Sequence, residues 1–433
     1  MVQSSASSSH RLGLALAIGL VALCGLHAAA QFWRGDLSDF IHFYRAASAL
    51  SSGENIYAAA RGRYIYPPLF AFILQPLIFL PAHWAAIVWT AISGTLIFFA
   101  ICIAAKEAAA RWSPINRPQG GLFQGPIAAG ATLLSLDKIH ATLTLGQTDG
   151  IMLLAFACVL RWMVRAPYLA GLAVGASANI KYLSLIYVPF FLLKRNGKAA
   201  FAAVASFAFF LVLPGFQIGF ARVIEYAVNS LGGLGRLWDN YQQPTLILSV
   251  TWDRSISLTS AVFRFAHRVG LSDLVALAVV VLLLSMFLGA VILIGNRHGV
   301  RLYQSREVEA DSGQTNAFHI EWAILIFIAV AFSPQSTARH MILLLLVYSV
   351  AIAIFLVQKT KAPRIFLATA VLVSASSLSL PFWMIGLASQ RENWRAISGA
   401  SWCALALILG IVWVGARTIA SQPRSPERTS HCS

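Results

Sequence analysis

The sequence is organised around a polar stretch between two apolar runs, residues 35–81: GDLSDFIHFYRAASALSSGENIYAAARGRYIYPPLFAFILQPLIFLP. Two of the few carboxylates in the chain, Asp36 and Asp39, stand at its start. An acid just outside an apolar span is either a solvated loop residue or a functional group. His, Tyr and Arg side chains and the Pro67-Pro68 pair crowd the same stretch, which favours the functional interpretation.

The composition predicts a protein embedded in lipid. The chain has 433 residues, of which 58% are hydrophobic and 11% charged, and its mean hydropathy is +0.72. A soluble protein of this length does not need so much apolar surface. The net charge of +16 could suit nucleic acid, but the basic residues fall in short clusters between apolar runs. Anionic lipid head groups and the positive-inside bias explain such clusters better, so we predict a lipid bilayer and no nucleic acid as partner.

A membrane-spanning helix needs about 20 apolar residues. Residues 69–80 are too few to cross the membrane and are predicted to form a half-helix or an interfacial helix. Residues 166–193 lie between two basic clusters and are predicted to form a re-entrant hairpin of two short helices. We predict an all-α polytopic membrane protein of roughly 10–12 transmembrane helices. It has one membrane domain over residues 12–417, with disordered ends at 1–11 and 418–433. Full spans are expected near 12–30, 84–105, 126–142, 149–165, 199–216, 271–295, 318–333, 338–358, 364–386 and 397–417.

The basic clusters also predict an orientation. If the N-terminus is cytoplasmic, every strongly basic connector falls on the cytoplasmic side. Residues 31–83 then form the first outer loop, with interfacial helices. The other polar segments, at 145–150, 226–253 and 333–340, emerge on the same outer face. Lys181 is the exception, because it is a lysine at membrane depth, where a cation must line a wet cavity or meet an anion.

With these segments in view, the chain resembles glycosyltransferase family 87, integral-membrane enzymes of the GT-C class that include polyprenol-phosphate-mannose-dependent mannosyltransferases. The resemblance is spread over most of the chain. Two departures stand out: Asp149 replaces a usual Asn, and Tyr182-Leu183-Ser184 follows Lys181 instead of a proline-containing turn. The matching motifs are Asp39-Phe40, the run 43–47, Gly53 to Tyr57, Tyr66-Pro67-Pro68 with Pro76 and Pro81, Gly146-Gln147, the run 171–181, Ser333-Pro334 and Arg339-His340.

The resemblance implies a GT-C-like bundle with a periplasmic-side cavity at the inner membrane. It also implies inverting transfer of a hexose, with mannose expected, from a polyprenyl-phosphate sugar to a hydroxyl of a glycolipid or glycan. No Asp-x-Asp motif or nucleotide-phosphate loop occurs, which fits a lipid-phosphate donor. We expect no cofactor and no metal. The cysteines, at positions 24, 102, 158, 403 and 432, have neither metal-ligand nor disulfide spacing.

The resemblance places the catalytic acid at Asp39, as the base that takes the acceptor proton. Asp36 is the alternative, because three residues separate the two acids and a helix would turn both to one side. Lys181 and Arg339 are candidates for binding the donor phosphate. Arg339 could equally be an anchor at the membrane interface. For His340 the sequence favours a hydrogen-bonded packing role, although it is also a candidate for binding.

Other polar side chains are candidates for the sugar. Gln147, Asp149 and Gln243 could hydrogen-bond its hydroxyls, and Tyr66 could stack on a pyranose face. The aromatic belt of a membrane protein explains any one of the aromatic residues as well.

Two functions of other classes compete with the transferase. The first is a secondary transporter, which typically shows repeated halves and ionisable groups at mid-membrane, whereas the polar groups here collect on one face. The second is a non-catalytic lipid-binding protein of envelope assembly. Loss of glycosyl transfer on replacing Asp39 in a folded protein would separate an enzyme from both.

Overall fold

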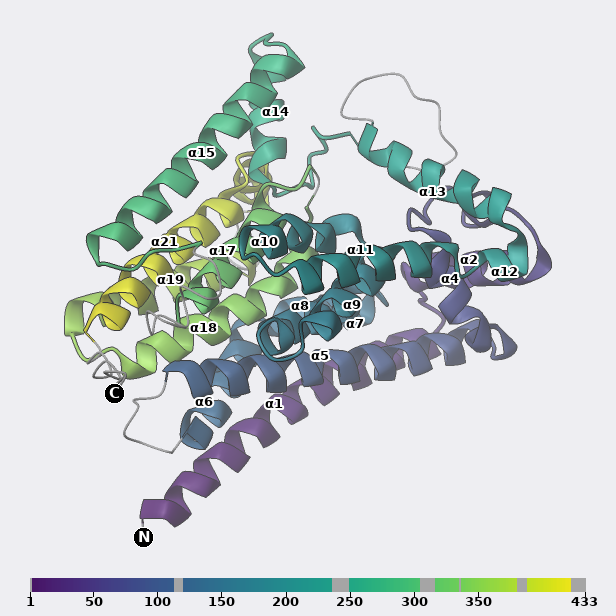
Figure 1. The fold of residues 1–433 in the computed structure, drawn as a ribbon. Helices are drawn as coiled ribbons and strands as arrows, with labels where there is room; N and C mark the ends of the chain where they lie inside the picture. Colours follow the sequence, from purple (N-terminus) through teal and green to yellow (C-terminus); the bar gives the residue numbers. More distant parts are fainter. Residues whose placement is uncertain are drawn as a thin grey trace, which may run out of the picture.

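A computed structural model describes residues 2–112, 120–235, 249–303, 316–334, 336–379 and 388–421. These residues form helices and turns, with no strand among them, so the predicted all-α class is confirmed. Two long helices, α1 (Val2–Trp33) and α5 (Ala82–Trp112), cross the molecule side by side (Figure 1). Between them in sequence lie short helices: α2 (Phe40–Ser52), α3 (Ile56–Ala59), α4 (Pro68–Leu74) and the 3-10 helix η1 (Gln75–Phe79).

The rest of the described chain packs further helices against this pair. The first group is α6 (Gly120–Leu134), α7 (Leu136–Thr144), α8 (Asp149–Trp162), α9 (Pro167–Ala178), η2 (Tyr182–Ile186), α10 (Tyr187–Leu193), α11 (Gly197–Val212), α12 (Gly215–Ile218) and α13 (Phe220–Gly235). The second is α14 (Leu258–Arg268), α15 (Asp273–Arg297), α17 (Ala317–Ala331), η3 (Ala338–Leu343), α18 (Leu344–Val357), α19 (Lys361–Ser379), α20 (Ala388–Ala396) and α21 (Gly399–Ala420).

Six helical stretches among the described residues are long and apolar enough to cross a membrane. The protein is therefore a polytopic helical membrane protein, as predicted, and the number of ten to twelve spans stays a prediction. Four shorter apolar helices accompany the six, at 68–79, 167–178, 182–193 and 317–331. The six stretches are Ser8–Trp33, Ala82–Trp112, Gly197–Ile218, Asp273–Arg297, Ala338–Val357 and Gly399–Ala420.

The structure corrects one predicted span and refines a short helix. The span expected at 126–142 is divided at Ser135 into α6 and α7. Asp137 and Lys138 form an ion pair directly after this break, and a charged pair is costly inside a straight span that faces lipid. The segment 69–80 is helical as expected, but Pro76 lacks an N–H for an α-helical bond, and the helix continues as the 3-10 helix η1.

The segment 166–193 returns to the end at which it starts. It contains α9, then Lys181 in an extended conformation, then η2 and α10. The side chain of Asn196, just after α10, donates to the Met163 carbonyl at 2.9 Å, just before α9. Both flanks therefore lie at one end of the molecule, in agreement with the expected hairpin.

Helices are described on both sides of the predicted domain limits of 12 and 417. Helix α1 begins at Val2, and the backbone of Ser9 and His10 lies against Gly125 of α6. Helix α21 continues to Ala420, and Thr418 accepts a hydrogen bond from Gln358. The domain limits and the disordered ends stay predictions, and residues 422–433 lie outside the described chain.

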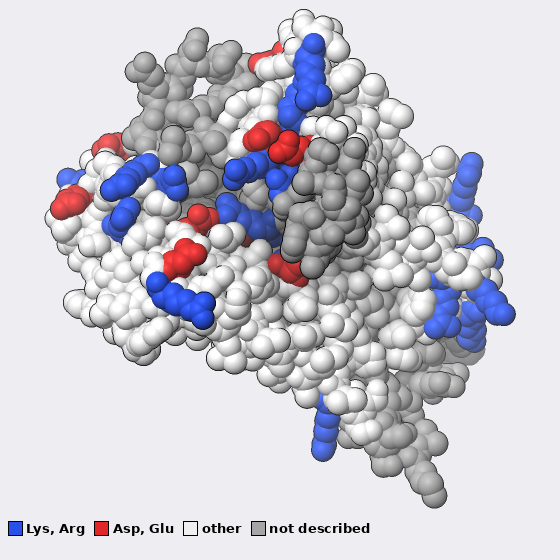
Figure 2. Space-filling model, turned by 180° about the vertical axis from the view of Figure 1, so that it is seen from behind, with Lys and Arg blue, Asp and Glu red and all other residues white. Residues whose placement is uncertain are grey.

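The bundle has two chemically different ends, and α8 runs from one to the other. Its 14 residues rise about 20 Å. The basic end comprises residues 106–111, 161–166, 194–198 and 295–303; the site end comprises residues 34–39, 145–149, 179–182 and 333–340. Figure 2 shows this difference on one face of the molecule. At the right of the view, Lys and Arg side chains lie without Asp or Glu near them, whereas at the left basic and acidic side chains lie together around a hollow.

Buried ion pairs fasten the basic end. Lys194 Nζ lies 2.5 Å from Glu321 Oε2, with side-chain exposures of 1% and 0%. The Tyr303 N–H donates to the other oxygen of Glu321, and Arg161 pairs with Glu107 at 3.0 Å. Connectors that are far apart in the sequence are thus joined where the helices end.

This pairing predicts a measurable stability effect. Glu321→Gln should lower the free energy of unfolding by about 3 kcal/mol, because it leaves the Lys194 ammonium buried without a counter-charge. Adding Lys194→Met should recover most of the loss, because the amide still accepts from Tyr303 N–H and no charge stays buried. Thermal unfolding in detergent measures both variants, and a double variant no more stable than the single one would contradict this account.

Candidate functional site

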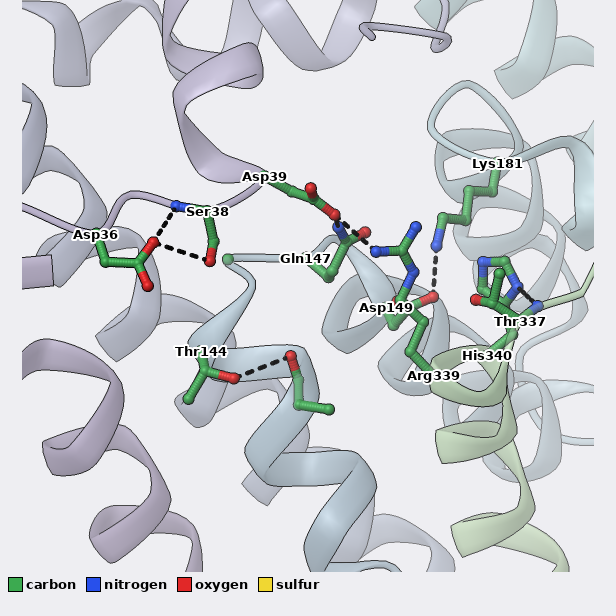
Figure 3. Close-up of polar contacts among 12 residues, drawn as sticks. Asp36, Ser38, Asp39, Thr144, Gln147, Asp149, Lys181, Thr337, Arg339 and His340 are labelled. Atoms are coloured by element: carbon green, nitrogen blue, oxygen red, sulfur yellow. Dashed lines mark hydrogen bonds and ion pairs between the residues drawn. The ribbon is translucent and has the colours of Figure 1, made fainter. Parts of the chain in front are cut away.

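The site is built around the carboxylate of Asp39, at the start of helix α2. One of its oxygens, Oδ2, accepts hydrogen bonds from Gln147 Nε2 at 2.5 Å and from Arg339 Nη1 at 2.6 Å (Figure 3). The three side chains come from the first loop, the turn before α8 and the 3-10 helix η3 that precedes α18. The Asp39 side chain is 37% exposed and that of Arg339 29%, so the pair lies at the rim of the packed protein.

A second ion pair lies beside the first. Lys181 Nζ is 2.5 Å from Asp149 Oδ1, and their side-chain exposures are 12% and 1%. Asp149 is the first residue of α8, where the helix dipole favours a negative charge. Together with Asp39 and Arg339, this pair gives two positive and two negative charges. The four charges sum to zero, and the buried Asp149 has the counter-charge that a carboxylate removed from water requires.

Two acceptor atoms in this cluster are buried and unpaired. Gln147 Oε1 and Asp149 Oδ2 have no hydrogen-bond partner among the described residues, and both residues are at most 2% exposed. A buried acceptor without a donor costs free energy. Such atoms are therefore suited to a ligand that brings hydroxyl groups.

His340 is held in a fixed orientation next to these pairs. The Thr337 N–H donates to its Nδ1 at 3.1 Å, as part of a capping box at the start of η3. Since Nδ1 accepts this bond, the proton of the neutral ring is on Nε2. The structure thus gives His340 a hydrogen-bonded packing role and leaves an N–H donor on its other side.

The turn before α8 explains why Gln147 reaches Asp39. Gly146 has a φ of 64°, and a Cβ atom there would come within 2.7 Å of Phe40 Cβ, so only glycine fits without strain. Its carbonyl accepts from Trp89 Nε1 at 2.9 Å. The turn is thereby pressed against the start of α2, and the next residue is placed beside the carboxylate.

Of the remaining predicted site residues, Asp36 lies apart from the cluster and Tyr66 lies near Arg339. Asp36 Oδ1 accepts from the N–H and the hydroxyl of Ser38, at 3.2 and 3.4 Å, and its side chain points away from the Asp39 cluster (Figure 3). Tyr66 is buried, 5.5 Å from the ring of Phe43, and close enough to Arg339 to interact with it electrostatically. Gln243 lies outside the described residues.

The segment that leads into η3, the helix of Arg339, is fixed by a serine network that sequence analysis did not single out. The Ile256 N–H donates to the Ser336 carbonyl at 2.7 Å, and the Ser336 N–H donates to Ser255 Oγ at 3.2 Å. Ser260 Oγ donates to the Pro334 carbonyl at 3.0 Å. Small hydroxyl side chains are common in membrane helices, so spacing alone does not separate these from others.

A single arginine, Arg264 of α14, holds this network in place. Its guanidinium donates to the carbonyls of Trp252 and Ser255, at 2.8 and 3.1 Å, and to that of Ala396 at 2.8 Å. Burial lowers the pKa of Arg264, and the nearby charge of Arg268 lowers it further. The side chain stays charged, and it ties α14 and the segment before α21 to the loop around Ser255.

Comparisons with known proteins agree with the expected family. Residues 64–310 match the model of Glycosyltransferase family 87. A segment of 178 residues is 26% identical to the polyprenol-phosphate-mannose-dependent alpha-(1-2)-phosphatidylinositol mannoside mannosyltransferase of Mycobacterium tuberculosis (strain ATCC 25618 / H37Rv). The match covers 40% of this chain and 41% of that relative, so the chain spans about two fifths of the relative's length. Asp39 and Arg339 lie outside residues 64–310.

The arginine clamp generates a prediction. Arg264→Ala should lower the free energy of local opening by about 2 kcal/mol in residues 250–257 and 336–343, because several carbonyls lose a charged donor. Hydrogen exchange followed by mass spectrometry measures this directly. The exposed Arg254→Ala variant is the matched control and should leave exchange in both segments unchanged. Unaltered exchange in 336–343 of the Arg264 variant would show that the clamp does not reach the Arg339 loop.

Proposed function

The chain belongs to glycosyltransferase family 87, and on that premise we propose that it transfers a hexose from a polyprenyl-phosphate sugar to a hydroxyl of a glycolipid or glycan, with inversion at the anomeric carbon. Mannose is the proposed sugar, because the M. tuberculosis relative is named for a mannose donor. The observation that carries the proposal is the Asp39 carboxylate, held on one oxygen by Arg339 and Gln147 within a neutral cluster of charged and amide side chains.

Asp39 is the proposed base. Its Oδ2 is occupied by Arg339 and Gln147, whereas Oδ1 has no hydrogen-bond partner among the described residues. The acceptor hydroxyl gives its proton to this carboxylate as its oxygen bonds to the anomeric carbon. The bond from that carbon to the phosphate oxygen breaks at the same time, and polyprenyl phosphate takes the electron pair. A phosphate leaves without protonation, so one carboxylate is sufficient.

Lys181 and Arg339 are the proposed phosphate ligands. Both carry N–H donors that can turn from their carboxylate partners toward a phosphate, and charge-assisted hydrogen bonds of this kind are strong. Phosphate brings negative charge to a cluster whose own charges cancel, and the negative charge on the leaving group increases during the reaction. Stabilisation is therefore greatest in the transition state, as catalysis requires.

The sugar itself would bind at the unpaired acceptors. Gln147 Oε1 and Asp149 Oδ2 are buried and without donors, and hexose hydroxyls would supply those donors. A site built to accept hydroxyl protons discriminates strongly against a ligand that lacks them, because its acceptors then stay unpaired. Tyr66 lies in the aromatic cluster beside Arg339, where its ring edge can line the same space.

The proposed location is the inner membrane, with the site facing the periplasm. The basic end carries Lys and Arg in the connectors 106–111, 161–166 and 194–198, and the positive-inside bias assigns such an end to the cytoplasm. The site end lies at the other end of α8. A lipid-linked donor and a lipid-linked acceptor would both reach it from the outer leaflet.

The base generates the first functional prediction. Asp39→Asn should lower the rate of transfer at least about 100-fold, because the amide cannot take the acceptor proton. Purified protein is incubated with a panel of polyprenyl-phosphate sugars, and glycosylated product is measured by mass spectrometry. Asp36→Asn, a matched change outside the cluster, should retain activity within about twofold. Full activity of Asp39→Asn, with an unchanged melting temperature, would remove Asp39 from the mechanism.

The proposed phosphate site generates a second functional prediction. Lys181→Met should raise KM for the lipid-phosphate donor about tenfold or more, because one charge-assisted hydrogen bond is lost, whereas Lys181→Arg should recover part of the affinity. Lys198→Met removes the same charge at the basic end and should leave the donor KM unchanged. Steady-state kinetics with varied donor decides the point, and an unchanged donor KM in Lys181→Met would exclude Lys181 as a phosphate ligand.

A further inference from the structure

Beside Asp39, the first loop carries a basic cluster that the reaction outlined above does not use. Resting on the proposed function, we propose that His42, Arg45, Arg61 and Arg63 form a binding site for an anionic group of the acceptor. The group would be a phosphate or a carboxylate on the molecule whose hydroxyl is glycosylated. The acceptor class would then be an acidic glycolipid or glycan.

The cluster is assembled by two elements that pack against each other. His42 lies one helical turn after Asp39 on α2, and Arg45 lies one turn further. Arg61 and Arg63 flank Gly62 in a tight turn after α3, in which Arg61 has a φ of 53°. The Gly62 N–H donates to the Tyr57 carbonyl at 2.8 Å and closes this turn.

Aromatic contacts bring the turn alongside α2. The ring of Phe43 lies 6.4 Å from that of Tyr64 and 5.5 Å from that of Tyr66, so the residues after the turn run along the helix next to His42. All three arginines act electrostatically on the His42 ring, Arg63 most strongly. All three charges therefore act on the same side chain.

The charge balance of this basic cluster differs from that of the inner cluster. The four charges of Asp39, Arg339, Asp149 and Lys181 cancel in pairs. By contrast, Arg45, Arg61 and Arg63 have no carboxylate partner among the described residues, and Asp39, one helical turn before His42, is already bound by Arg339. These three arginines thus place three positive charges without a paired carboxylate near the base. Such an excess raises the local concentration of an anion and orients it.

His42 supplies a second and independent observation. It is 8% exposed, and its Nδ1 has no hydrogen-bond partner among the described residues. Burial lowers the pKa of His42, as do Arg63, Arg45 and Arg61, whereas Asp39 acts in the opposite direction. The ring is therefore neutral at pH 7, and it offers a buried hydrogen-bonding nitrogen among the arginines without adding charge.

The stereochemistry of the reaction assigns this site to the acceptor. In an inverting displacement the acceptor approaches the anomeric carbon from the side opposite to the departing phosphate. Lys181 and Arg339, the proposed phosphate ligands, lie on one side of Asp39, and the start of α2 runs from Asp39 away from both (Figure 3). An anion held by Arg45 of α2 and by the two arginines of the turn after α3 is consequently on the side from which the hydroxyl attacks.

The test compares two short-chain acceptors that carry the same glycan, one with a phosphodiester head group and one neutral. With wild-type enzyme, KM for the anionic acceptor should be lower by about tenfold. In the double variant Arg61→Gln/Arg63→Gln, KM for the anionic acceptor should rise until the two values nearly coincide. Arg34→Gln, an exposed arginine of the same loop outside the cluster, is the control and should keep the difference. A wild-type enzyme without preference, or a double variant that keeps it, would overturn the proposal.

Direct binding separates this proposal from the proposed function. Binding of both acceptors to the full-length protein in neutral-lipid nanodiscs is measured without donor. The protein could bind the anionic acceptor more tightly than the neutral one, lose this preference in the Arg61→Gln/Arg63→Gln variant, and yet transfer no sugar. That result would refute the proposed transferase and support the anion site. Anionic phospholipid in the nanodisc distinguishes the source: if it displaces the anionic acceptor with equal affinity, the cluster is a general head-group site and the acceptor assignment is wrong.

Discussion

The hydrogen bonds to one oxygen atom, Asp39 Oδ2, bring three distant parts of the chain together at the site end. Gln147 and Arg339 both donate to it. Gln147 is placed by the turn at Gly146, and Arg339 is placed by the segment that leads into η3, so each of these segments must itself be held in position. Trp89 fixes the first and the Ser255 network fixes the second. Asp39 can therefore be held at a protein rim where a loop acid would otherwise be solvated, and its second oxygen is left for chemistry.

The same electrostatic constraint explains the architecture between the two ends. Charges close to lipid must be paired, and every buried charge described above at either end of α8 has a partner: Asp149 with Lys181 at the site end, and Lys194 with Glu321 at the basic end. The helices between carry apolar side chains almost without interruption. At the ends of two short elements a side chain binds a helix carbonyl: Asn179 Nδ2 donates to the Gly175 carbonyl at the end of α9, and Thr259 Oγ1 donates to the Phe332 carbonyl after α17.

Hydropathy predicted most helices, because a lipid bilayer requires a similar length of apolar residues in every span. The sequence also named six candidate site residues that the structure brings together: Asp39, Gln147, Asp149, Lys181, Arg339 and His340. Spacing could not separate Asp39 from Asp36, since both precede the same helix; the local bonds of Ser38 turn Asp36 away. The break at Ser135 was not predicted, although the charged pair Asp137-Lys138 follows it directly in the sequence. The Arg264 clamp was not predictable, because it depends on a contact with Ala396, which is far away in the sequence.

Under the proposed function, the pairing of Arg339 with Asp39 couples donor binding to activation of the base. A phosphate that draws Arg339 toward itself would release Asp39 Oδ2 from the guanidinium at the moment when a leaving group is in place. The carboxylate would then be held by Gln147 alone and could turn toward the acceptor hydroxyl. The resting pair of Arg339 and Asp39 therefore compensates both charges while the donor site is empty, and it sets the order of events.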